Sequence, residues 1–311
     1  MDNNNVIQKD LDEIQNIINQ NRLLMRYKKN DNYRNSYDIF EKINDSEYGG
    51  VYKVKQKISE EIKAIKIIDK KSIIYHYINI YPMKLVKENM DEYITLYINM
   101  IKNMMIIGTD KKNNGNSIKL YEYYDTEDEL VIVMELCDDI LGRFFIKNNN
   151  FFNSDELLKL LSQLNNSLKI MVENRIIHGQ IYLNKILIKY LDSEKKKYIY
   201  KLNLFSDPFH KIKTIHLNSC APEILKEEVK GFHEKSDLWS LGILIYTLYF
   251  KKNPYNGSSK NEILEEIKCE SINKTKNSNL DDLINNLLVE DPLKRITWKN
   301  YFNHPFLRKN N

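Results

Sequence analysis

The three cysteines could in principle form a disulfide or bind a metal ion. Cys137, Cys220 and Cys269 form an odd set, and no two of them have the CxxC spacing of a zinc or redox site. Thiols in this arrangement predict neither a disulfide framework nor a metal centre, and they favour a reducing compartment, cytoplasmic or otherwise intracellular. The sequence also lacks the DxDxDG loop with which an EF-hand binds calcium. We therefore expect no redox chemistry and no direct calcium sensing.

Four short segments in the second half of the chain carry distinctive residues. They are Ala221-Pro222-Glu223, residues 237–242 (DLWSLG), residues 291–297 (DPLKRIT) and His304-Pro305-Phe306. In this order and spacing they resemble the APE motif, the DxWSxG helix start and the C-terminal end of a eukaryotic protein kinase domain. The last two segments resemble the calcium/calmodulin-dependent and calcium-dependent Ser/Thr kinase group. The resemblance covers about residues 37–307 and implies a two-lobed α+β fold, with a small antiparallel sheet lobe at 37–136 and a larger helical lobe at 137–307.

The resemblance assigns structural roles to five residues. Glu223 and Arg295 would form a bidentate carboxylate–guanidinium pair, a geometry that lysine cannot supply. Asp237 would accept backbone N–H bonds from the catalytic loop at the start of a helix. His178 and Phe205 would belong to an apolar spine, and for His178 this role is favoured over a catalytic or metal-binding one. These residues argue for a fold and for no particular chemistry.

A second set of residues would bind a nucleotide. Residues 63–66 (KAIK) resemble the VAIK strand, so Lys66 would contact the α- and β-phosphates rather than being a solvated lysine. Its carboxylate partner would be Glu88 or Glu92 on the following helix, and Glu92 is preferred because apolar Leu96 follows it by four positions. The other nucleotide contacts implied by the resemblance are Gly49, Val51, Ala64, the gatekeeper Met134, and the backbones of Glu135 and Cys137.

The positions that would transfer phosphate carry unsuitable side chains. In residues 178–187 (HGQIYLNKIL), Gln180 occupies the position of the catalytic Asp, and an amide cannot act as a base at neutral pH. Lys185 occupies the position of the magnesium-binding Asn. Leu204 replaces the Asp of the DFG motif and offers no oxygen to Mg²⁺. Asp207 is the alternative metal ligand, provided that the preceding strand ends three residues later.

The glycine-rich loop is degraded as well. Asn44 and Ser46 replace its first two glycines, and Asp45 and Glu47 add negative charge where phosphates would lie. Glycines allow backbone N–H groups to approach phosphates closely. Phosphate binding should therefore be weakened, although Gly49 remains.

The secondary structure expected to position these residues is mainly strands in the first part of the chain and mainly helices in the second part. Residues 6–25 have the apolar spacing of an amphipathic helix within an N-terminal extension, 1–36, that docks on its own domain or recruits a partner. A helix at about 83–105 and a loop at 109–117 interrupt the strands of one sheet. The strands are expected at 37–43, 51–57, 63–68, 118–124 and 130–134, and later helices at 154–175, 237–250 and 279–289. Residues 308–311 form a tail.

Composition argues against two classes of partner. The 47 Lys and Arg against 43 Asp and Glu leave a net charge of +4, too small an excess to predict a nucleic-acid surface. No apolar run reaches the roughly 18 residues of a membrane span, and the N-terminus resembles neither a signal peptide nor a myristoylation site. We expect neither nucleic acid nor membrane to be a partner.

Three functions follow from these observations. The first is a pseudokinase that acts as a binding or allosteric module for a protein partner, such as an active kinase or its substrate. The second is a divergent Ser/Thr kinase that uses Lys66 and an alternative acid such as Asp207. The third is a structural interaction protein with a filled nucleotide pocket. The first function requires no cofactor; if ATP binds, it should bind weakly and without a metal, between Lys66 and Lys185.

Overall fold

The computed structural model describes residues 27–29, 31–46, 48–73, 83–149, 152–194, 196–204, 217–226, 234–269 and 272–308, with the backbone alone at 46 and 83–94. The chain divides into two compact units. One comprises Met1–Thr109 and Ile118–Leu136, and the other comprises Asp110–Ser117 and Cys137–Asn311. The helix expected at 6–25 lies outside the described residues.

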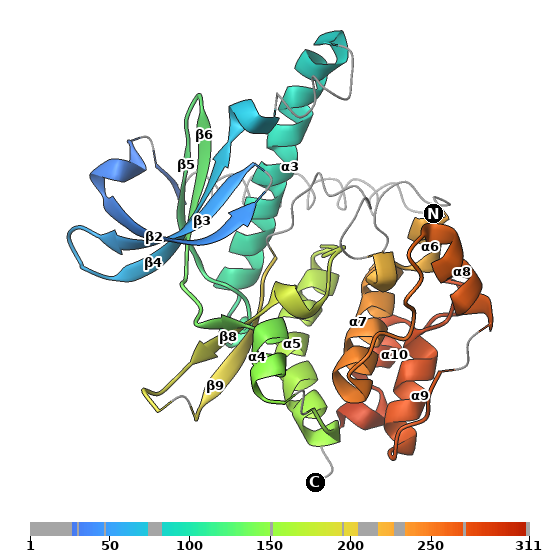
Figure 1. The fold of residues 1–311 in the computed structure, drawn as a ribbon. Coiled ribbons are helices and arrows are strands. Elements are labelled where there is room, and N and C mark those ends of the chain that lie inside the picture. The colour runs from blue at the N-terminus through green and yellow to red at the C-terminus, as the bar shows by residue number, and fades with distance from the viewer. Residues whose placement is uncertain are drawn as a thin grey trace, which may run out of the picture. The chain divides into compact units, whose positions relative to one another are not determined.

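The first unit is built on a twisted sheet with strand order β1-β5-β6-β4-β3-β2 among the described residues (Figure 1). Its strands are β1 (Lys28–Lys29), β2 (Tyr37–Ser46), β3 (Gly49–Gln56), β4 (Ile62–Asp69), β5 (Leu120–Asp125) and β6 (Glu129–Met134). Helix α3 (Met83–Thr109) packs against β5. The five antiparallel strands lie where period-two alternation predicts them, while β1 adds an unpredicted strand parallel to β5.

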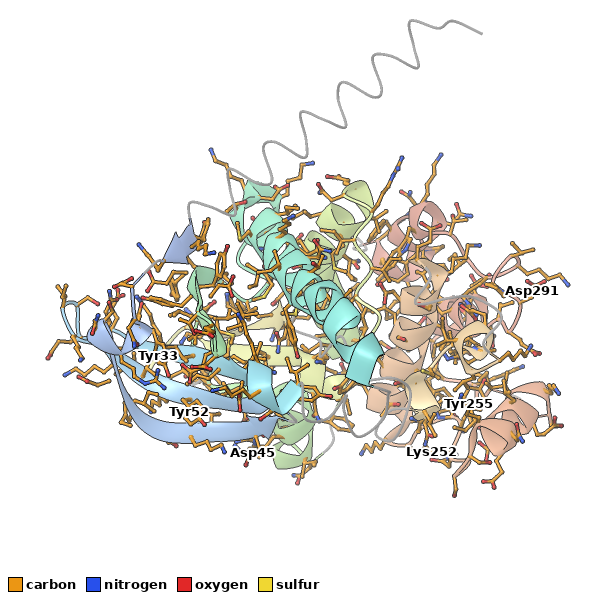
Figure 2. The ribbon with its side chains drawn as sticks, turned by 90° about the horizontal axis from the view of Figure 1, so that it is seen from above. Tyr33, Asp45, Tyr52, Lys252, Tyr255 and Asp291 are labelled. Atoms are coloured by element: carbon orange, nitrogen blue, oxygen red, sulfur yellow. The ribbon has the colours of Figure 1, made fainter. Side chains whose placement is uncertain are left out.

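Aromatic residues cover one face of this sheet. Tyr33, Tyr37 and Tyr124 are buried there with the β-branched residues Val54, Ile65, Val131 and Val133. Tyr33 comes from the short 3₁₀ helix η1 (Tyr33–Asn35), and its ring meets that of Tyr124 edge-on at a centroid distance of 6.0 Å. Figure 2 labels Tyr33 and Tyr52, which both belong to this unit. Residues before the expected domain start at 37 therefore complete the core of the sheet, because the apolar face would otherwise meet water.

Charged and polar groups tie η1 to the strands at the edge of this face. Arg34 donates from both terminal nitrogens to Glu129, at 2.9 and 3.1 Å. Glu122 accepts from the hydroxyls of Tyr37 and Tyr124, at 2.5 and 3.0 Å. The bonds to Glu122 satisfy the hydroxyls of Tyr37 and Tyr124, whose rings are buried.

The second unit contains a small antiparallel sheet and a set of helices. The sheet consists of β7 (Asp139–Ile140), β8 (Ile186–Tyr190) and β9 (Tyr198–Leu202). Helix α7, labelled in Figure 1, is buried over most of its circumference, and α5 and α9 pack against it. The helices are η2 (Lys111–Asn113), α4 (Leu141–Lys147), α5 (Ser154–Glu173), η3 (Leu183–Lys185), η4 (Leu217–Ser219), α6 (Pro222–Leu225), α7 (Glu234–Phe250), α8 (Lys260–Cys269), α9 (Ser278–Leu287), α10 (Trp298–Phe302) and η5 (Pro305–Leu307).

The segment Asp110–Ser117 belongs to the second unit although the sequence places it between α3 and β5. Side-chain amides hold it there: Asn116 donates to the carbonyl of Tyr200 at 2.9 Å, and Ser167 donates to Asn113 Oδ1 at 2.8 Å. Asn113 and Asn116 are both buried. The lobe boundary drawn from sequence, 37–136, thus differs from the structure over these eight residues, because their hydrogen-bond partners lie in α5 and β9.

Candidate functional site

Four of the expected nucleotide contacts lie on the sheet face opposite the aromatic cluster. Val51 is paired with Lys66 across β3 and β4, and Ala64 is paired with Met134 across β4 and β6. Because alternate residues of β4 share a face, all four side chains project to the same side. Lys66 is only 8% exposed. The predicted partner Glu92 lies in α3, and its side chain is outside the described residues.

The two residues expected to contribute backbone groups fall in different units. Glu135 ends the first unit's strand region, and its N–H donates to the carbonyl of Lys119 at 2.8 Å. This donor is therefore already used within the sheet unit. Cys137 belongs to the second unit, is half-buried and is not part of a disulfide.

The segment aligned with the glycine-rich loop is a tight hairpin. The β2–β3 ladder continues through Asn44 and Val51 to Ser46 and Gly49, next to the turn. Gly49 has φ +149°, and a Cβ there would overlap the carbonyl oxygen of Ile67 on β4. Glycine is required at this position because the two strands approach closely, a structural reason separate from phosphate contact.

Asp237, in the first turn of α7, holds the segment aligned with the catalytic loop. Its carboxylate accepts the backbone N–H groups of His178 and Gly179, at 2.8 and 2.7 Å. Burial raises the pKa of Asp237 to about 7, and the two N–H bonds act in the opposite direction by stabilising the charged form. The carboxylate fixes the course of the loop from Gly179, which has φ +74°.

Both ring nitrogens of His178 are engaged. Nδ1 accepts the N–H of Gln180 at 3.2 Å, so Nε2 carries the proton and donates to the carbonyl of Asn203 at 3.0 Å. Burial, together with the charge of Lys185, lowers the pKa of His178 to about 3. The imidazole is therefore neutral and packed, with no lone pair available for a proton or a metal.

The free energy of unfolding should depend on pH because His178 is neutral in the folded protein. The pKa of His178 is lowered from its usual 6.5. On acidification below pH 6.5, His178 therefore binds a proton in the unfolded chain but not in the folded chain. The difference in free energy of unfolding between wild type and the non-titrating variant His178→Phe should have its full value above pH 6.5. It should fall by about 1.4 kcal/mol per pH unit as the pH drops towards 3.

Urea unfolding of both proteins between pH 7.5 and 4.5 measures this difference. The comparison cancels the opposite contribution of Asp237, which is common to wild type and His178→Phe. A difference that stays constant over this pH range would show that His178 has the same pKa in the folded and unfolded protein.

Three other residues of the segment 178–187, Gln180, Tyr182 and Lys185, were expected at or next to catalytic positions. Lys185 ends η3, and its ammonium lies 5.8 Å from the ring centroid of Tyr182. Burial raises the pKa of the Tyr182 phenol to about 12. Gln180 is half-buried, and its amide replaces the carboxylate that a general base would need.

The metal position of the second motif is apolar. Leu204 is buried, and an aliphatic side chain offers no ligand to a hard cation. The structure describes no group of three or more His, Cys, Asp and Glu residues able to hold a metal ion within its described ranges. The aliphatic Leu204 and the ammonium of Lys185 therefore do not fit magnesium at these two positions. Phe205 and the alternative ligand Asp207 lie outside the described residues.

Arg295 and Glu223 form a buried pair that joins α6 to the segment before α10. Two hydrogen bonds of 2.7 and 2.8 Å connect the two guanidinium nitrogens to the two carboxylate oxygens. The remaining N–H groups of Arg295 donate to three backbone carbonyls, those of Lys235, Val289 and Glu290. All five guanidinium donors are used, a geometry open to arginine alone.

A cavity of about 430 Å³, which no sequence motif indicated, lies beside residues 181–184. Five segments separated in sequence form its walls, so no local motif could have revealed it. Its lining carries amides, hydroxyls and aliphatic groups and no charged side chain: Ile181, Tyr182, Leu183, Asn184, Leu217, Asn218, Ser219, Ile243, Leu244, Thr247, Asn253, Gly257 and Ser258.

Comparison with known proteins identifies the source of these motifs. Residues 37–307 match the protein kinase domain family. The chain belongs to the protein kinase domain family. The kinase domain's β-sheet unit and helical unit agree with the α+β fold expected from the sequence. None of the helices in the described part of this kinase domain has the length and apolar character needed to cross a membrane.

Several Ser/Thr kinases are similar to this kinase domain. Calcium-dependent protein kinase 5 of Plasmodium berghei is 30% identical over 77% of the chain and 39% of its own length. Serine/threonine-protein kinase atg1 of Dictyostelium discoideum is 28% identical over 64% of the chain and 31% of its length. Aurora kinase of Candida glabrata is 28% identical over 88% of the chain and 71% of its length. The chain thus spans about a third of the length of the first two relatives.

Proposed function

We propose that this protein kinase domain is a pseudokinase, a kinase fold without useful phosphotransfer that serves as a binding or allosteric module. One observation carries the proposal: Gln180, Lys185 and Leu204 occupy the three positions whose oxygens the reaction needs. Losing a general base alone costs about 10²–10⁴ in rate. Replacing both metal ligands also removes the electrostatic stabilisation on which phosphoryl transfer depends.

The parts of the fold that are kept support the same proposal. Asp237 still fixes the loop backbone, and Glu223 still pairs with Arg295 in the core. The chain therefore retains the contacts that maintain a kinase-like surface while its reactive groups are replaced. Such a surface suits a protein partner, and an active kinase or the substrate of one is the partner class that we propose.

A phosphotransfer assay tests the proposal. With labelled ATP and either Mg²⁺ or Mn²⁺, the purified chain should incorporate no phosphate above background, because Gln180 cannot act as a base and Lys185 and Leu204 offer no oxygen to a metal. The control is Lys66→Met, which should give the same background. The triple variant Gln180→Asp, Lys185→Asn, Leu204→Asp restores the missing oxygens and shows whether the assay can detect a revived site. Turnover by wild type that Lys66→Met abolishes would refute the pseudokinase proposal.

The similarity to Ser/Thr kinases favours one alternative, a divergent Ser/Thr kinase that uses Lys66 with another acid such as Asp207. Nucleotide binding separates it from the pseudokinase. If a pseudokinase binds ATP, the Lys185 ammonium should replace the metal, so binding should be weak and insensitive to EDTA, and Lys185→Asn should weaken it. A Mg²⁺ requirement in a thermal-shift titration would favour the kinase. No ATP-dependent shift at all would favour a structural protein with a filled pocket.

A further inference from the structure

A second, smaller cavity lies in the helical unit, in the loop that follows α7. Its volume is about 200 Å³, and its walls come from the end of α7, the loop 252–256 and the chain after α8. Figure 2 labels Lys252 and Tyr255 in this loop. The lining is formed by Tyr246, Lys252, Asn253, Pro254, Tyr255, Asn256, Ile272 and Asn273. We propose that this cavity binds a small oxyanion such as a phosphate monoester.

The hydrogen bonds of the lining residues leave donors unused. The Oδ1 of Asn253 accepts the N–H of Tyr255 at 3.1 Å, and its NH₂ group has no acceptor in the part of the chain that the structure describes. Asn256 uses one amide hydrogen on the carbonyl of Asn253, and Asn273 uses one on the hydroxyl of Tyr246. Each of these two amides keeps a second hydrogen. At least one N–H of every asparagine in the cavity thus remains for a ligand.

The charge of the cavity selects an anion. Lys252 is exposed and has no carboxylate within ion-pair distance among the described residues. The carboxylate of Glu266, which contacts the same loop, accepts the backbone N–H groups of Asn256 and Gly257 at 2.7 and 3.1 Å. An unpaired ammonium beside several amide donors is the complement of a group with oxygen acceptors and negative charge.

The loop is held in place before any ligand arrives. Tyr255 is buried, and its ring stacks on that of Trp239 at a centroid distance of 5.9 Å and an angle of 12°. Pro254 is buried next to it and fixes the backbone. A preorganised set of donors loses little conformational freedom on binding. The volume of about 200 Å³ suits one tetrahedral group and is below the usual range for a nucleotide-sized ligand.

The test uses inorganic phosphate as the probe and the full chain labelled with ¹⁵N. Phosphate should cause saturable shifts of the Asn253 side-chain amide signals, at constant ionic strength set with chloride. Lys252→Met should weaken this binding about tenfold, the effect of losing one charge-assisted contact. The matched control Lys299→Met removes an exposed lysine on α10 and should leave binding unchanged. Asn253→Asp keeps the oxygen that accepts the Tyr255 N–H but replaces the NH₂ donors with negative charge, and should abolish binding.

Two further probes distinguish the source of the oxyanion. Binding of O-phosphoserine tighter than that of acetate would assign the site to phosphate esters, and the reverse order would assign it to carboxylates; either result supports an oxyanion site. Shifts that grow without saturation, or equal affinity in wild type and Asn253→Asp, would overturn the proposal. The outcome is independent of the phosphotransfer assay, because no residue of the catalytic loop takes part.

Discussion

Arg295→Lys is expected to lower the free energy of unfolding by about 2–6 kcal/mol, because at least two of its five buried acceptors lose their donor, at about 1–3 kcal/mol each. Glu223 and Arg295 are each 1% exposed, so water cannot replace a lost partner. Lysine keeps the charge but has three donors on one nitrogen, whereas the guanidinium serves both oxygens of Glu223 and three carbonyls. Urea denaturation of the purified variant measures the loss.

The matched control is Lys294→Met, one residue earlier in the chain. Lys294 is exposed and lies 3.8 Å from Asp291, so its removal should change stability by less than about 1 kcal/mol. If Arg295→Lys were as stable as this control, the hydrogen-bonding geometry of the guanidinium would add nothing to the effect of its positive charge. The double variant Arg295→Met, Glu223→Leu should recover part of the loss, because it removes both buried charges together.

A chain that begins at Tyr37, where the family match begins, is expected to lose the cooperative unfolding of its sheet unit and to aggregate. It lacks β1, Tyr33 and Arg34, and so leaves the aromatic face open to water. Tyr33 is 1% exposed, and deleting a buried aromatic side chain alone costs about 3–5 kcal/mol. That loss is a large part of the 5–15 kcal/mol that stabilises a typical domain.

The control for this truncation begins at Tyr27. It keeps β1 and η1 and should unfold at a higher midpoint than the chain that begins at 37, as measured by thermal denaturation followed by circular dichroism. Tyr33→Ala in the full chain should shift the midpoint in the same direction as the truncation at 37. Equal midpoints for the chains beginning at 27 and at 37 would show that β1 and η1 add nothing to the stability of the core.

Residues whose type and spacing act locally could be read from the sequence. The alternation of β4 places Lys66 and Ala64 on one face, and the structure has them there in register with Val51 and Met134. An acidic residue in the first turn of a helix is a similarly local feature: Asp237 accepts two N–H groups there, although α7 begins at Glu234 rather than at the expected residue 237. Helix α5 begins at the expected residue, Ser154, and Asn153 before it provides the capping oxygen.

Features that depend on distant partners could not be read in this way. Strand β1 has two residues and no periodicity, and it pairs with Tyr123 and Tyr124 far along the chain. The segment 109–117 has the composition of a solvent-exposed loop, yet Asn113 and Asn116 are buried because their hydrogen-bond partners come from α5 and β9. The small cavity after α7 depends likewise on Asn273, which lies beyond α8.

The segment Asp110–Ser117, in which Asn113, Asn116 and Ser117 are buried, prevents the two units from being separated as genetic modules. The backbone passes from one unit to the other after Thr109, after Ser117 and after Leu136, so no single cut yields both halves complete. A helical half started at Cys137 would leave Ser167 and the Tyr200 carbonyl without the amides of Asn113 and Asn116, at about 1–3 kcal/mol for each buried group. Exchange of one half between relatives by recombination would therefore lower stability unless residues 110–117 were transferred with the helical half. Substitutions at 110–117 should also vary together with those in α5 and β9 rather than with those in the flanking strands.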